Sequence, residues 1–413
     1  MTPFSYIDAQ ASELAADLRT LVGFDTTNPP GRNYADVTAH LVREMTRSGL
    51  KARRFAISPA LLRRALPAEQ HGFPRYNVVG KWAVPGARKT IHFNAHYDVV
   101  PVSGEWRHGN PFGGAVSNGW IYGRGTADMK GSIASLLLAL RALRMAKATP
   151  LVNVEVSFTA DEETDSALGT GWLVKHAPIE PDYAIVMEGG DLNRVCCGHN
   201  GVVWLEVTVH GKAAHGSTPE RGINAVEHMA ALVTDLERYK DVLRKRSFAT
   251  PESKMMVPTI NVGGEFGPGP GGKINTVPAL ARFTIDRRVL AVESVAQAEK
   301  DLRAFLAASA RRIPRCRITV TKLSESQPCF TSPTHSFFAA MSRCVGTVRR
   351  QKPVFSVSTG FNDMHFFASE LKIPTLGYGP GGQAHHAVDE RASLKELLAS
   401  AKIYASLLTS FAG

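Results

Sequence analysis

The sequence predicts an α/β protein in which a mixed sheet is interrupted by an inserted α+β domain. Strand-like apolar runs alternate with helical runs up to residue 197, an order typical of a sheet covered by helices. From residue 198 onwards, strictly alternating strands enclose amphipathic helices, and the first kind of pattern returns later. The 413 residues also exceed one ordinary domain. We therefore expect a first domain from residues 1–197 and 316–413 and an inserted domain from residues 198–315.

The first domain is expected to begin with two helices, followed by its strands. The segment 55–76 contains Pro and Arg without a clean period, so we interpret it as a surface insertion. The run IASLLLALRALRMA (133–146) predicts a buried helix, because it is too short and too charged to cross a bilayer. The other predicted helices are ASELAADLRTLV (11–22) and NYADVTAHLVREMTRSG (33–49), and the predicted strands are NVVGKWA (77–83), TIHFNAHYDVV (90–100), LVNVEVSF (151–158), DYAIVMEG (182–189) and KIPTLGYG (372–379).

The inserted domain is expected to be a ferredoxin-like α+β sandwich with helices on one face of its sheet. Its strands are predicted at VVWLEVTVH (202–210), TINVGGEF (259–266) and ALARFTIDRRV (279–289), and its helices at NAVEHMAALVTDLERY (224–239) and SVAQAEKDLRAFLAASA (294–310). RITVTKL (317–323) completes a strand–helix–strand–strand–helix–strand order if it is counted here. The Gly- and Pro-rich stretch GGEFGPGPGGKINTVP (263–278) indicates a loop.

Composition and charge limit the function classes. The hydrophobic content of 44% is that of a globular protein, and acidic residues near the N-terminus argue against a signal peptide. We expect a cytoplasmic protein without membrane attachment. The charge of +11 comes from scattered basic doublets, which do not indicate nucleic-acid binding. The five cysteines lack CxxC spacing and indicate reduced thiols rather than disulfides or metal ligands.

Residues that could bind metal follow the predicted strands. His96 and Asp98 end the run TIHFNA and lie two residues apart, so the acid can orient the imidazole on one face of the strand. An HxD pair alone is common and indicates little. Asp128 lies in the glycine-rich turn GRGTADMKG (123–131) directly before a helix. It could cap that helix, or its two oxygens could bridge two metals.

Carboxylates also follow two further strands. Asp161, Glu162 and Glu163 come after LVNVEVSF, and Glu188 ends DYAIVMEG. Open α/β sheets gather ligand sites at the carboxyl ends of their strands. Acids gathered there repel one another unless cations compensate, so the sequence indicates a cation site.

A histidine pair, His385 and His386, lies in AHHAVDE (384–390) after the glycine loop of the last predicted strand. Such a pair is usually exposed surface. Here it completes a set of nitrogen and oxygen donors that suits two zinc ions, or cobalt or manganese in their place. No cysteine ligand is needed.

These residues, in this order, resemble the metallopeptidase family that includes acetylornithine deacetylase, succinyl-diaminopimelate desuccinylase, aminoacylase and glutamate carboxypeptidase. The resemblance extends from about Leu14 to the end of the chain and implies a mixed-sheet zinc-peptidase catalytic domain with an inserted dimerisation and lid domain. It is carried by HYDVVP (96–101), WIYGRGTADMKG (120–131), DEE (161–163), the strand ending at Glu188, GKAAHGSTPERGINAVE (211–227), GGKINTVP (271–278), IDRR (285–288) and HHAVDE (385–390).

Carried over residue by residue, the resemblance implies a two-metal site. His96 and Glu188 resemble ligands of one metal, and Glu163 and His386 resemble ligands of the other. Asp128 resembles the carboxylate that bridges them, and the family also has a cis peptide bond after it.

The resemblance also assigns the residues around the metals. Asp98 resembles the acid that orients the first histidine, and Glu162 resembles the general base. His386 is preferred over His385 as the ligand, because the family's histidine is followed by two residues and then by an Asp-Glu or Asn-Glu pair, here 389–390. Asp161 has no role that we can derive, and we interpret it as a loop acid that hydrogen-bonds nearby backbone.

In the inserted domain, His215 resembles the histidine that reaches into the partner subunit's site to stabilise an oxyanion. The resemblance therefore implies a homodimer. Asn275 and Arg288 resemble groups that hold the substrate, although Arg288 could equally form a surface ion pair. Asp363 stands where the family has an Asp, but it follows Asn362 rather than the usual Thr or Ser, which leaves the contacts of this loop open.

We therefore expect a hydrolase that cleaves the amide bond of an N-acyl amino acid, of the deacetylase and desuccinylase kind, by metal-activated water. A dipeptidase or carboxypeptidase of the same family is the main alternative, because the metal site is shared and the pocket decides. A catalytically silent binding protein on the same fold is the non-enzymatic alternative.

Overall fold

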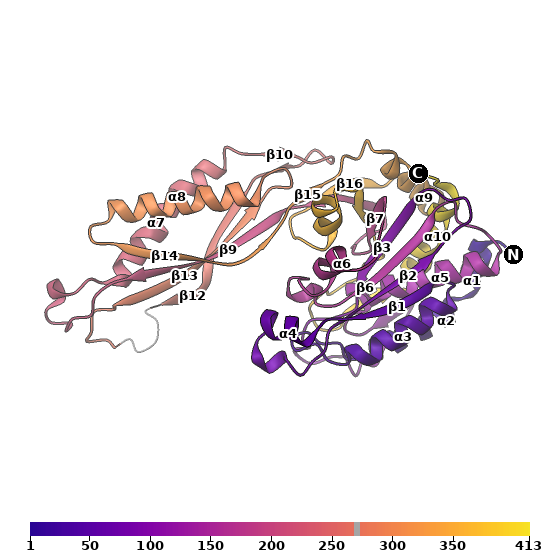
Figure 1. Ribbon diagram of the computed structural model, residues 1–413, viewed down its shortest axis with the longest axis horizontal. Coiled ribbons are helices and arrows are strands. Elements are labelled where there is room, and N and C mark those ends of the chain that lie inside the picture. The colour runs from indigo at the N-terminus through magenta and orange to yellow at the C-terminus, as the bar shows by residue number, and fades with distance from the viewer. Residues whose placement is uncertain (268–272) are drawn as a thin grey trace. The chain divides into compact units, whose positions relative to one another are not determined.

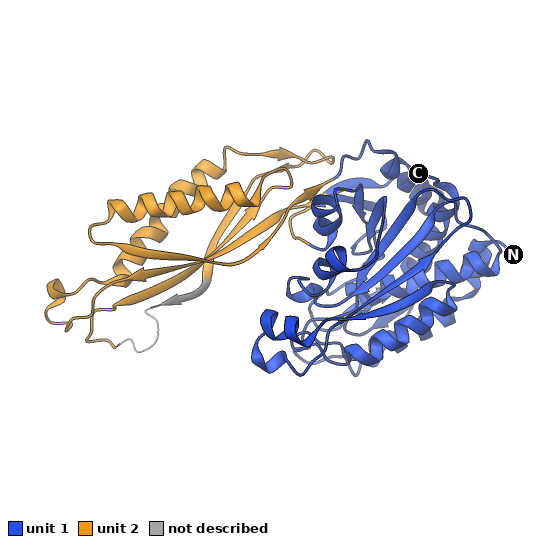
Figure 2. Cartoon of the chain, viewed as in Figure 1, with its two compact units in different colours: residues 1–198, 331–356, 362–413 blue, residues 199–330, 357–361 orange. Residues whose placement is uncertain are grey.

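The chain folds into two compact units in the computed structural model, which describes residues 1–267 and 273–413 (Figures 1 and 2). Unit 1 contains residues 1–198, 331–356 and 362–413, and unit 2 contains residues 199–330 and 357–361. The inserted domain was instead predicted to end at residue 315. The boundary differs because strand β14 (Arg317–Ser326) pairs with β9 (Gly201–His210) and so belongs to the sheet of unit 2.

Unit 1 is built on a mixed sheet, as predicted. Its strands run in the order β1-β2-β6-β3-β7-β17-β8, with β16 also on β8 and β15 at the end of the path, where the chain leaves unit 2. β3 is parallel to β6 and β7, and β17 is parallel to β7. The bounds are β1 (Lys51–Ala56), β2 (Tyr76–Trp82), β3 (Thr90–His96), β6 (Asn153–Thr159), β7 (Tyr183–Val186), β8 (Arg194–His199), β15 (Cys329–Phe330), β16 (Val354–Ser358) and β17 (Thr375–Gly377).

The helices of unit 1 pack on this sheet and on one another (Figure 1). The predicted buried helix is α5 (Gly131–Met145), which is covered by α1, α2 and α10 and is buried from Gly131 through Leu143. The others are α1 (Pro3–Ala9), α2 (Ala11–Gly23), α3 (Tyr34–Arg47), α4 (Pro59–Ala65), α6 (Thr170–His176), α9 (Ser336–Arg349) and α10 (Leu394–Ser410).

The segment 55–76 is more ordered than a plain surface insertion. It contains the short helix α4, whose Leu62 packs with Ile57 and Leu168 in a small apolar cluster. Its last part turns inward, and the side chain of Arg75 is fully buried. This inward turn matters for the site described below.

Unit 2 is the expected α+β sandwich. An antiparallel sheet with the order β12-β13-β9-β14 carries α7 (Ala225–Leu243) and α8 (Val295–Arg312), and apolar residues of both helices share one core with the inward residues of the strands. β13 (Leu280–Val289) alternates strictly between buried and partly buried positions. A short hairpin joins β10 (Phe248–Ala249) and β11 (Met255–Met256).

The loop predicted at 263–278 begins later than expected, because β12 extends over Thr259–Gly267. The bulge in its pairing with β13 lets the glycines remain within the strand. Residues 268–272 of the predicted loop lie outside the described residues.

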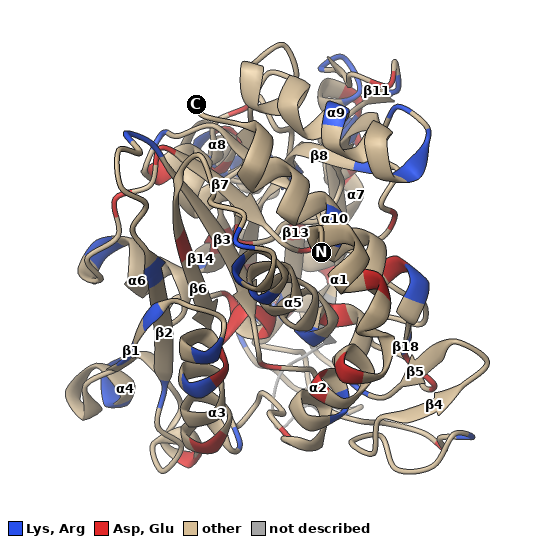
Figure 3. Ribbon diagram, turned by 90° about the vertical axis from the view of Figure 1, so that its right-hand side faces the viewer, with Lys and Arg blue, Asp and Glu red and all other residues tan. Residues whose placement is uncertain are grey.

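Basic and acidic residues are interspersed on helices α2 and α3 (Figure 3). Arg47 lies 2.8 Å from a Glu13 oxygen and 3.3 Å from a Glu44 oxygen. Some of the basic residues are therefore paired with neighbouring acids. Among the helices in the described parts of the chain, none is both long and apolar enough to cross a membrane.

Candidate metal centre

The carboxyl ends of three parallel strands bring the predicted site residues together. His96 is the last residue of β3, Glu162 and Glu163 follow β6, and Glu188 follows β7. In register, His96 lies opposite Thr159. Asp128 reaches the same edge from the turn Thr126–Lys130 that precedes α5, and the expected cis peptide bond follows it.

Asp128 stands between two histidines. One of its oxygens, Oδ1, lies 3.0 Å from Nε2 of His96, and the other, Oδ2, lies 3.3 Å from Nε2 of His386. Each oxygen thus faces a different imidazole, which is the arrangement required of a carboxylate that bridges two cations. It is His386, not His385, that makes this contact.

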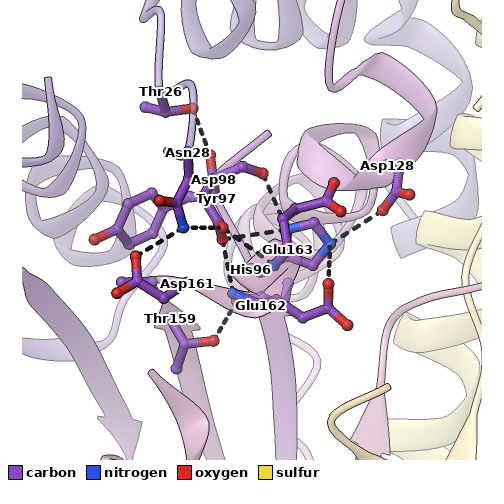
Figure 4. A network of polar contacts seen from close by, with 12 residues as sticks. Thr26, Asn28, His96, Tyr97, Asp98, Asp128, Thr159, Asp161, Glu162 and Glu163 are labelled. Carbon is purple, nitrogen blue, oxygen red and sulfur yellow. Dashed lines mark hydrogen bonds and ion pairs between the residues drawn. The ribbon is translucent and has the colours of Figure 1, made fainter. Parts of the chain in front are cut away.

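Glu163 joins the second histidine. Its Oε2 lies 3.2 Å from Nε2 of His386. His96, Asp128 and Glu163 each offer a ligand atom within 4.8 Å of the others. The structure therefore brings these ligand candidates into one cluster (Figure 4).

Two carboxylate oxygens of the cluster have unmet bonding capacity. Glu163 Oε1 and Glu188 Oε2 are buried and have no hydrogen-bond partner among the described residues. Buried carboxylate oxygens without partners are unfavourable unless a donor or a cation is present. Together with the histidine nitrogens they form a nitrogen and oxygen donor set that fits divalent zinc, cobalt or manganese.

The raised pKa values in the cluster also indicate a site for cations. Burial, reinforced by the negative charge on Asp128, raises the pKa of Glu188 to about 8. Burial and the charge on Glu188 likewise raise the pKa of Glu162 well above its ordinary value. The hydrogen bonds to Asp128 and Glu163 raise the pKa of His386 to about 10. In the metal-free protein, bound protons thus reduce the repulsion between the acids. Divalent ions would reduce the same repulsion when bound.

Asp128 responds in the opposite direction. Burial alone would raise its pKa, but the hydrogen bonds from His386 and His96 outweigh burial and lower the pKa of this carboxyl. It therefore remains ionised between the two imidazoles, as a bridging ligand must.

Asp98 is fully buried behind His96 (Figure 4). Nδ1 of His96 lies 3.0 Å from the backbone oxygen of Asp98 and 3.5 Å from its carboxylate Oδ1. The same carboxylate accepts the backbone N–H groups of Glu162 at 3.2 Å and Glu163 at 3.3 Å. Asp98 thus holds the second ring nitrogen of His96 and the start of the glutamate turn together.

Sequence reasoning missed two groups that support the cluster. Glu390 is fully buried, and its Oε1 accepts the backbone N–H groups of Ala127 at 2.9 Å and Asp128 at 3.1 Å, while Oε2 pairs with Arg124. Its place after HHAVD was used only to choose between histidines. Asp161 is no bystander that hydrogen-bonds nearby backbone, because its buried carboxylate pairs with Arg75.

Asp363, left open by the sequence, is buried in unit 1. Its carboxylate accepts hydrogen bonds from Ser166 and Thr170, both at 2.5 Å. Burial raises its pKa. Both partners lie in the segment that follows the glutamates, so the carboxylate of Asp363 is hydrogen-bonded to that segment.

The predicted residues of unit 2 fall into two places. His215 is exposed, and its neighbour Gly216 donates a 2.7 Å backbone hydrogen bond to Asn275, so these two loops pair. Arg288 lies at the other end of β13, where it forms an ion pair with Asp286 at 2.9 Å. The nine residues from Leu280 to Arg288 span roughly 27 Å of strand.

Comparison with known proteins decides the family. Residues 92–410, more than half of the chain, match the profile described as "Peptidase family M20/M25/M40". The chain belongs to this family. The predicted family resemblance and the mixed α/β fold are therefore confirmed.

Relatives of this M20 family member include curated enzymes. A succinyl-diaminopimelate desuccinylase from Methylocella silvestris is 30% identical over 345 residues, which covers 79% of this chain and 83% of that protein. An acetylornithine deacetylase from Proteus mirabilis is 30% identical and covers 76% and 78% of the two chains.

Solved structures share the fold. An M20 family metallo-carboxypeptidase from Sulfolobus solfataricus superposes with a TM-score of 0.75 at 20% identity, covering 96% of this chain and 98% of that one. A dinuclear metal binding M20 peptidase from Bacillus subtilis gives a TM-score of 0.69 at 13% identity, covering 97% and 98%. At these identities the M20 likeness concerns the fold.

Proposed function

We propose that this M20 family protein is a two-metal hydrolase that cleaves the amide bond of an N-acyl amino acid. The observation that carries the proposal is Asp128, whose two oxygens face His96 and His386 at 3.0 and 3.3 Å. The curated desuccinylase and deacetylase relatives, each 30% identical, support the substrate class.

The residues divide into two ligand sets. His96 and Glu188 would hold one ion, Glu163 and His386 the other, and Asp128 both. The partnerless oxygens of Glu163 and Glu188 support these assignments, because a cation would satisfy them. Zinc is the expected ion, with cobalt or manganese as alternatives. When bound, the two ions supply an activated water and polarise the scissile carbonyl.

Glu162 would move the proton. Its Oε2 lies 3.9 Å from Nε2 of His96, and its side chain is 14% exposed, so it borders the cluster without pairing closely with a cation. Burial raises its pKa and makes it a stronger base. It would take a proton from water and pass it to the leaving amine, while Asp98 keeps His96 oriented.

The residues that contact the substrate would come from unit 2. His215 is held by Ser217, whose Oγ lies 2.7 Å from Nδ1, so the exposed ring is oriented without being buried. We propose that it neutralises the oxyanion in the partner's site of a homodimer, with Asn275 on the adjoining loop. Arg288 would hold a substrate carboxylate by a bidentate contact, in exchange for Asp286.

The cellular location is part of the proposal. We propose a cytoplasmic location, because no disulfide joins any of the five cysteines, which all lie in the described parts of the chain, and this suits a reducing compartment.

A substrate screen tests the proposed function. The purified chain is assayed with N-succinyl and N-acetyl amino acids and with dipeptides, each with zinc, cobalt or manganese. We expect release of the free amino acid from an N-acyl substrate, and activity lost on chelation and restored by metal. Preference for dipeptides would favour the dipeptidase alternative, and preference for longer peptides with a free carboxyl end would favour the carboxypeptidase.

Glu162→Ala separates catalysis from metal binding. Because Glu162 is proposed to move a proton and not to bind metal, the variant should keep two metal ions and lose turnover by about 10²–10⁴-fold. Glu163→Gln is the matched control, and it should lose metal as well as activity. Metal content by mass spectrometry and steady-state kinetics check both. Near-normal turnover of Glu162→Ala would remove it as the base.

The non-enzymatic alternative makes a different prediction. A silent binding protein would release no amine from any substrate with any of the three metals, yet would still bind an N-acyl amino acid in a calorimetric titration.

A further inference from the structure

The turn that carries the two glutamates has an unusual backbone. Asp161, Asp165 and Ser166 have φ angles of 60°, 99° and 61°. Left-handed conformations are uncommon for residues other than glycine, and three within six residues need support from surrounding contacts. The backbone oxygen of Asp161 supplies part of that support by accepting the N–H groups of Thr164 at 3.2 Å and Ser166 at 2.7 Å.

Arg75 provides the main external contact to this turn. Its Nε lies 2.9 and 2.8 Å from the two oxygens of Asp161, and both side chains are buried. The guanidinium is itself fixed, because Nη1 donates to the backbone oxygen of Phe73 at 2.7 Å. It also fills the space above Gly31, where an added Cβ would lie 2.4 Å from Nη1.

Two further side chains donate hydrogen bonds to the carboxylate of Asp161. The Tyr34 hydroxyl donates to Oδ1 at 3.1 Å, and Asn28 Nδ2 donates to the same oxygen at 2.9 Å. Asn28 Nδ2 also lies 3.1 Å from Asp98 Oδ2 (Figure 4). The contacts of Asp161 therefore continue to the carboxylate that receives the backbone N–H groups of both glutamates.

The charge balance gives Arg75 a second effect. Asp98 and Asp161 are both buried carboxylates. Arg75 brings one buried positive charge into contact with Asp161. It therefore offsets the charge of that buried carboxylate.

We propose that Arg75 and Asp161 are positioning residues that set the turn at Glu162–Glu163. Their ion pair holds Asp161 in its left-handed conformation, so that the next two side chains diverge. Glu163 then reaches His386 at 3.2 Å, while Glu162 stays near His96 at 3.9 Å. The inference rests on the proposed function for the roles of these glutamates, but the turn itself can be tested independently.

Three variants and one control address the ion pair in the full-length chain. Arg75→Met removes the positive charge at similar length, Asp161→Asn removes the negative charge at the same size, and Arg75→Lys retains the charge but loses the geometry of the guanidinium. Arg141→Met is the matched control. It removes the buried arginine of helix α5 that pairs with Asp17 of helix α2. Neither residue of this pair belongs to the glutamate turn.

Hydrogen–deuterium exchange of the peptide covering 159–168 is the first measurement, made with and without chelator. We expect exchange at least ten-fold faster in Arg75→Met and Asp161→Asn, with partial recovery in Arg75→Lys and wild-type protection in Arg141→Met. Equal protection of this peptide in all four variants would overturn the inference. If one of the first two variants does not fold, the other gives the same comparison.

Cobalt titration followed by visible absorption is the second measurement. We expect Arg75→Met and Asp161→Asn to bind the cobalt ion at Glu163 about 10–100-fold more weakly and with an altered spectrum, while Arg141→Met keeps wild-type affinity and spectrum. Unchanged affinity and spectrum in both variants would show that the pair only stabilises the fold, and would overturn the inference.

The two measurements also distinguish the proposals. A wild-type chain that binds no cobalt and cleaves no substrate refutes the proposed function, yet the exchange of 159–168 still decides whether Arg75 sets the turn. A wild-type chain that is active while the exchange pattern does not depend on Arg75 refutes the inference alone.

Discussion

At the scale of single residues, the bridging carboxylate is held by its backbone as well as by its side chain. Glu390 accepts the N–H groups of Ala127 and Asp128 with one oxygen and pairs with buried Arg124 through the other. Both oxygens of this fully buried carboxylate are thereby engaged. Placing Asp128 between two histidines thus depends on a residue that contacts neither of them.

Glu390→Gln tests this support. The amide keeps the size and one acceptor, but it leaves the guanidinium of Arg124 buried without a charged partner. Removing one member of a buried pair typically destabilises by about 3–5 kcal/mol. Denaturant unfolding measures the loss. Asp389→Asn, at a half-buried neighbouring position, is the control, because the amide oxygen can still accept the backbone N–H of Arg107, and we expect it within about 0.5 kcal/mol of wild type. Wild-type stability of Glu390→Gln would contradict the assigned support.

At the scale of elements, the sequence predicts what is local and periodic. The ends of β3, β6 and β7 follow from apolar runs, and the acids that come next follow from chain order. The contact between Arg75 and Asp161 joins residues 86 positions apart and leaves no periodic signal. The placement of β14 depends on which sheet edge it meets, which alternation alone does not encode.

The backbone segments that follow β7 and β17 approach each other so closely that a side chain does not fit at Gly379. A Cβ added at Gly379 would lie 1.9 Å from the backbone oxygen of Met187, directly before Glu188. That oxygen also accepts a 2.7 Å hydrogen bond from Ser132 on helix α5, so it has little room to shift. The position of Glu188 therefore depends on glycine in the neighbouring segment.

Gly379→Ala should displace Glu188 and weaken the metal that it is proposed to hold. Overpacking at a rigid contact typically destabilises by about 1–3 kcal/mol. Gly346→Ala in helix α9 is the control, because nothing lies closer than 3.9 Å to its added Cβ, and alanine should stabilise that helix by about 0.5–1 kcal/mol. Thermal unfolding and metal titration are the measurements. A Gly379→Ala protein as stable as Gly346→Ala would contradict the predicted clash.

At the scale of the whole molecule, the two units have different sources of stability. The core of unit 2 is an apolar layer between its sheet and two helices. Unit 1 has a buried helix and sheet core, but it also gathers carboxylates at one sheet edge. A ligand that binds only the folded state stabilises it by about 2.7 kcal/mol at a hundred times its dissociation constant. Metal should therefore raise the unfolding temperature of unit 1 and leave that of unit 2 unchanged.

The same cluster predicts how the stability of the metal-free protein depends on pH. The pKa of Glu188 rises from 4.5 to about 8 on folding, and the pKa of His386 rises from 6.5 to about 10. Glu188 therefore holds more protons in the folded state than in the unfolded state between about pH 4.5 and 8. His386 does so between about pH 6.5 and 10. Where the folded state binds more protons, stability falls as pH rises.

We therefore expect the unfolding temperature of the chelated protein to fall between about pH 6.5 and 8, the range in which both groups act in the same direction. Lowering the pKa of Asp128 has no influence there, because Asp128 is ionised in both states throughout this range. With metal bound, the acids no longer need protons, so the decline should shrink. Glu188→Gln removes one titrating group and should flatten part of the slope in the chelated protein. Calorimetry at several pH values, with and without metal, is the measurement. A chelated protein that becomes more stable between pH 6.5 and 8 would contradict the balance of charges inferred for the cluster.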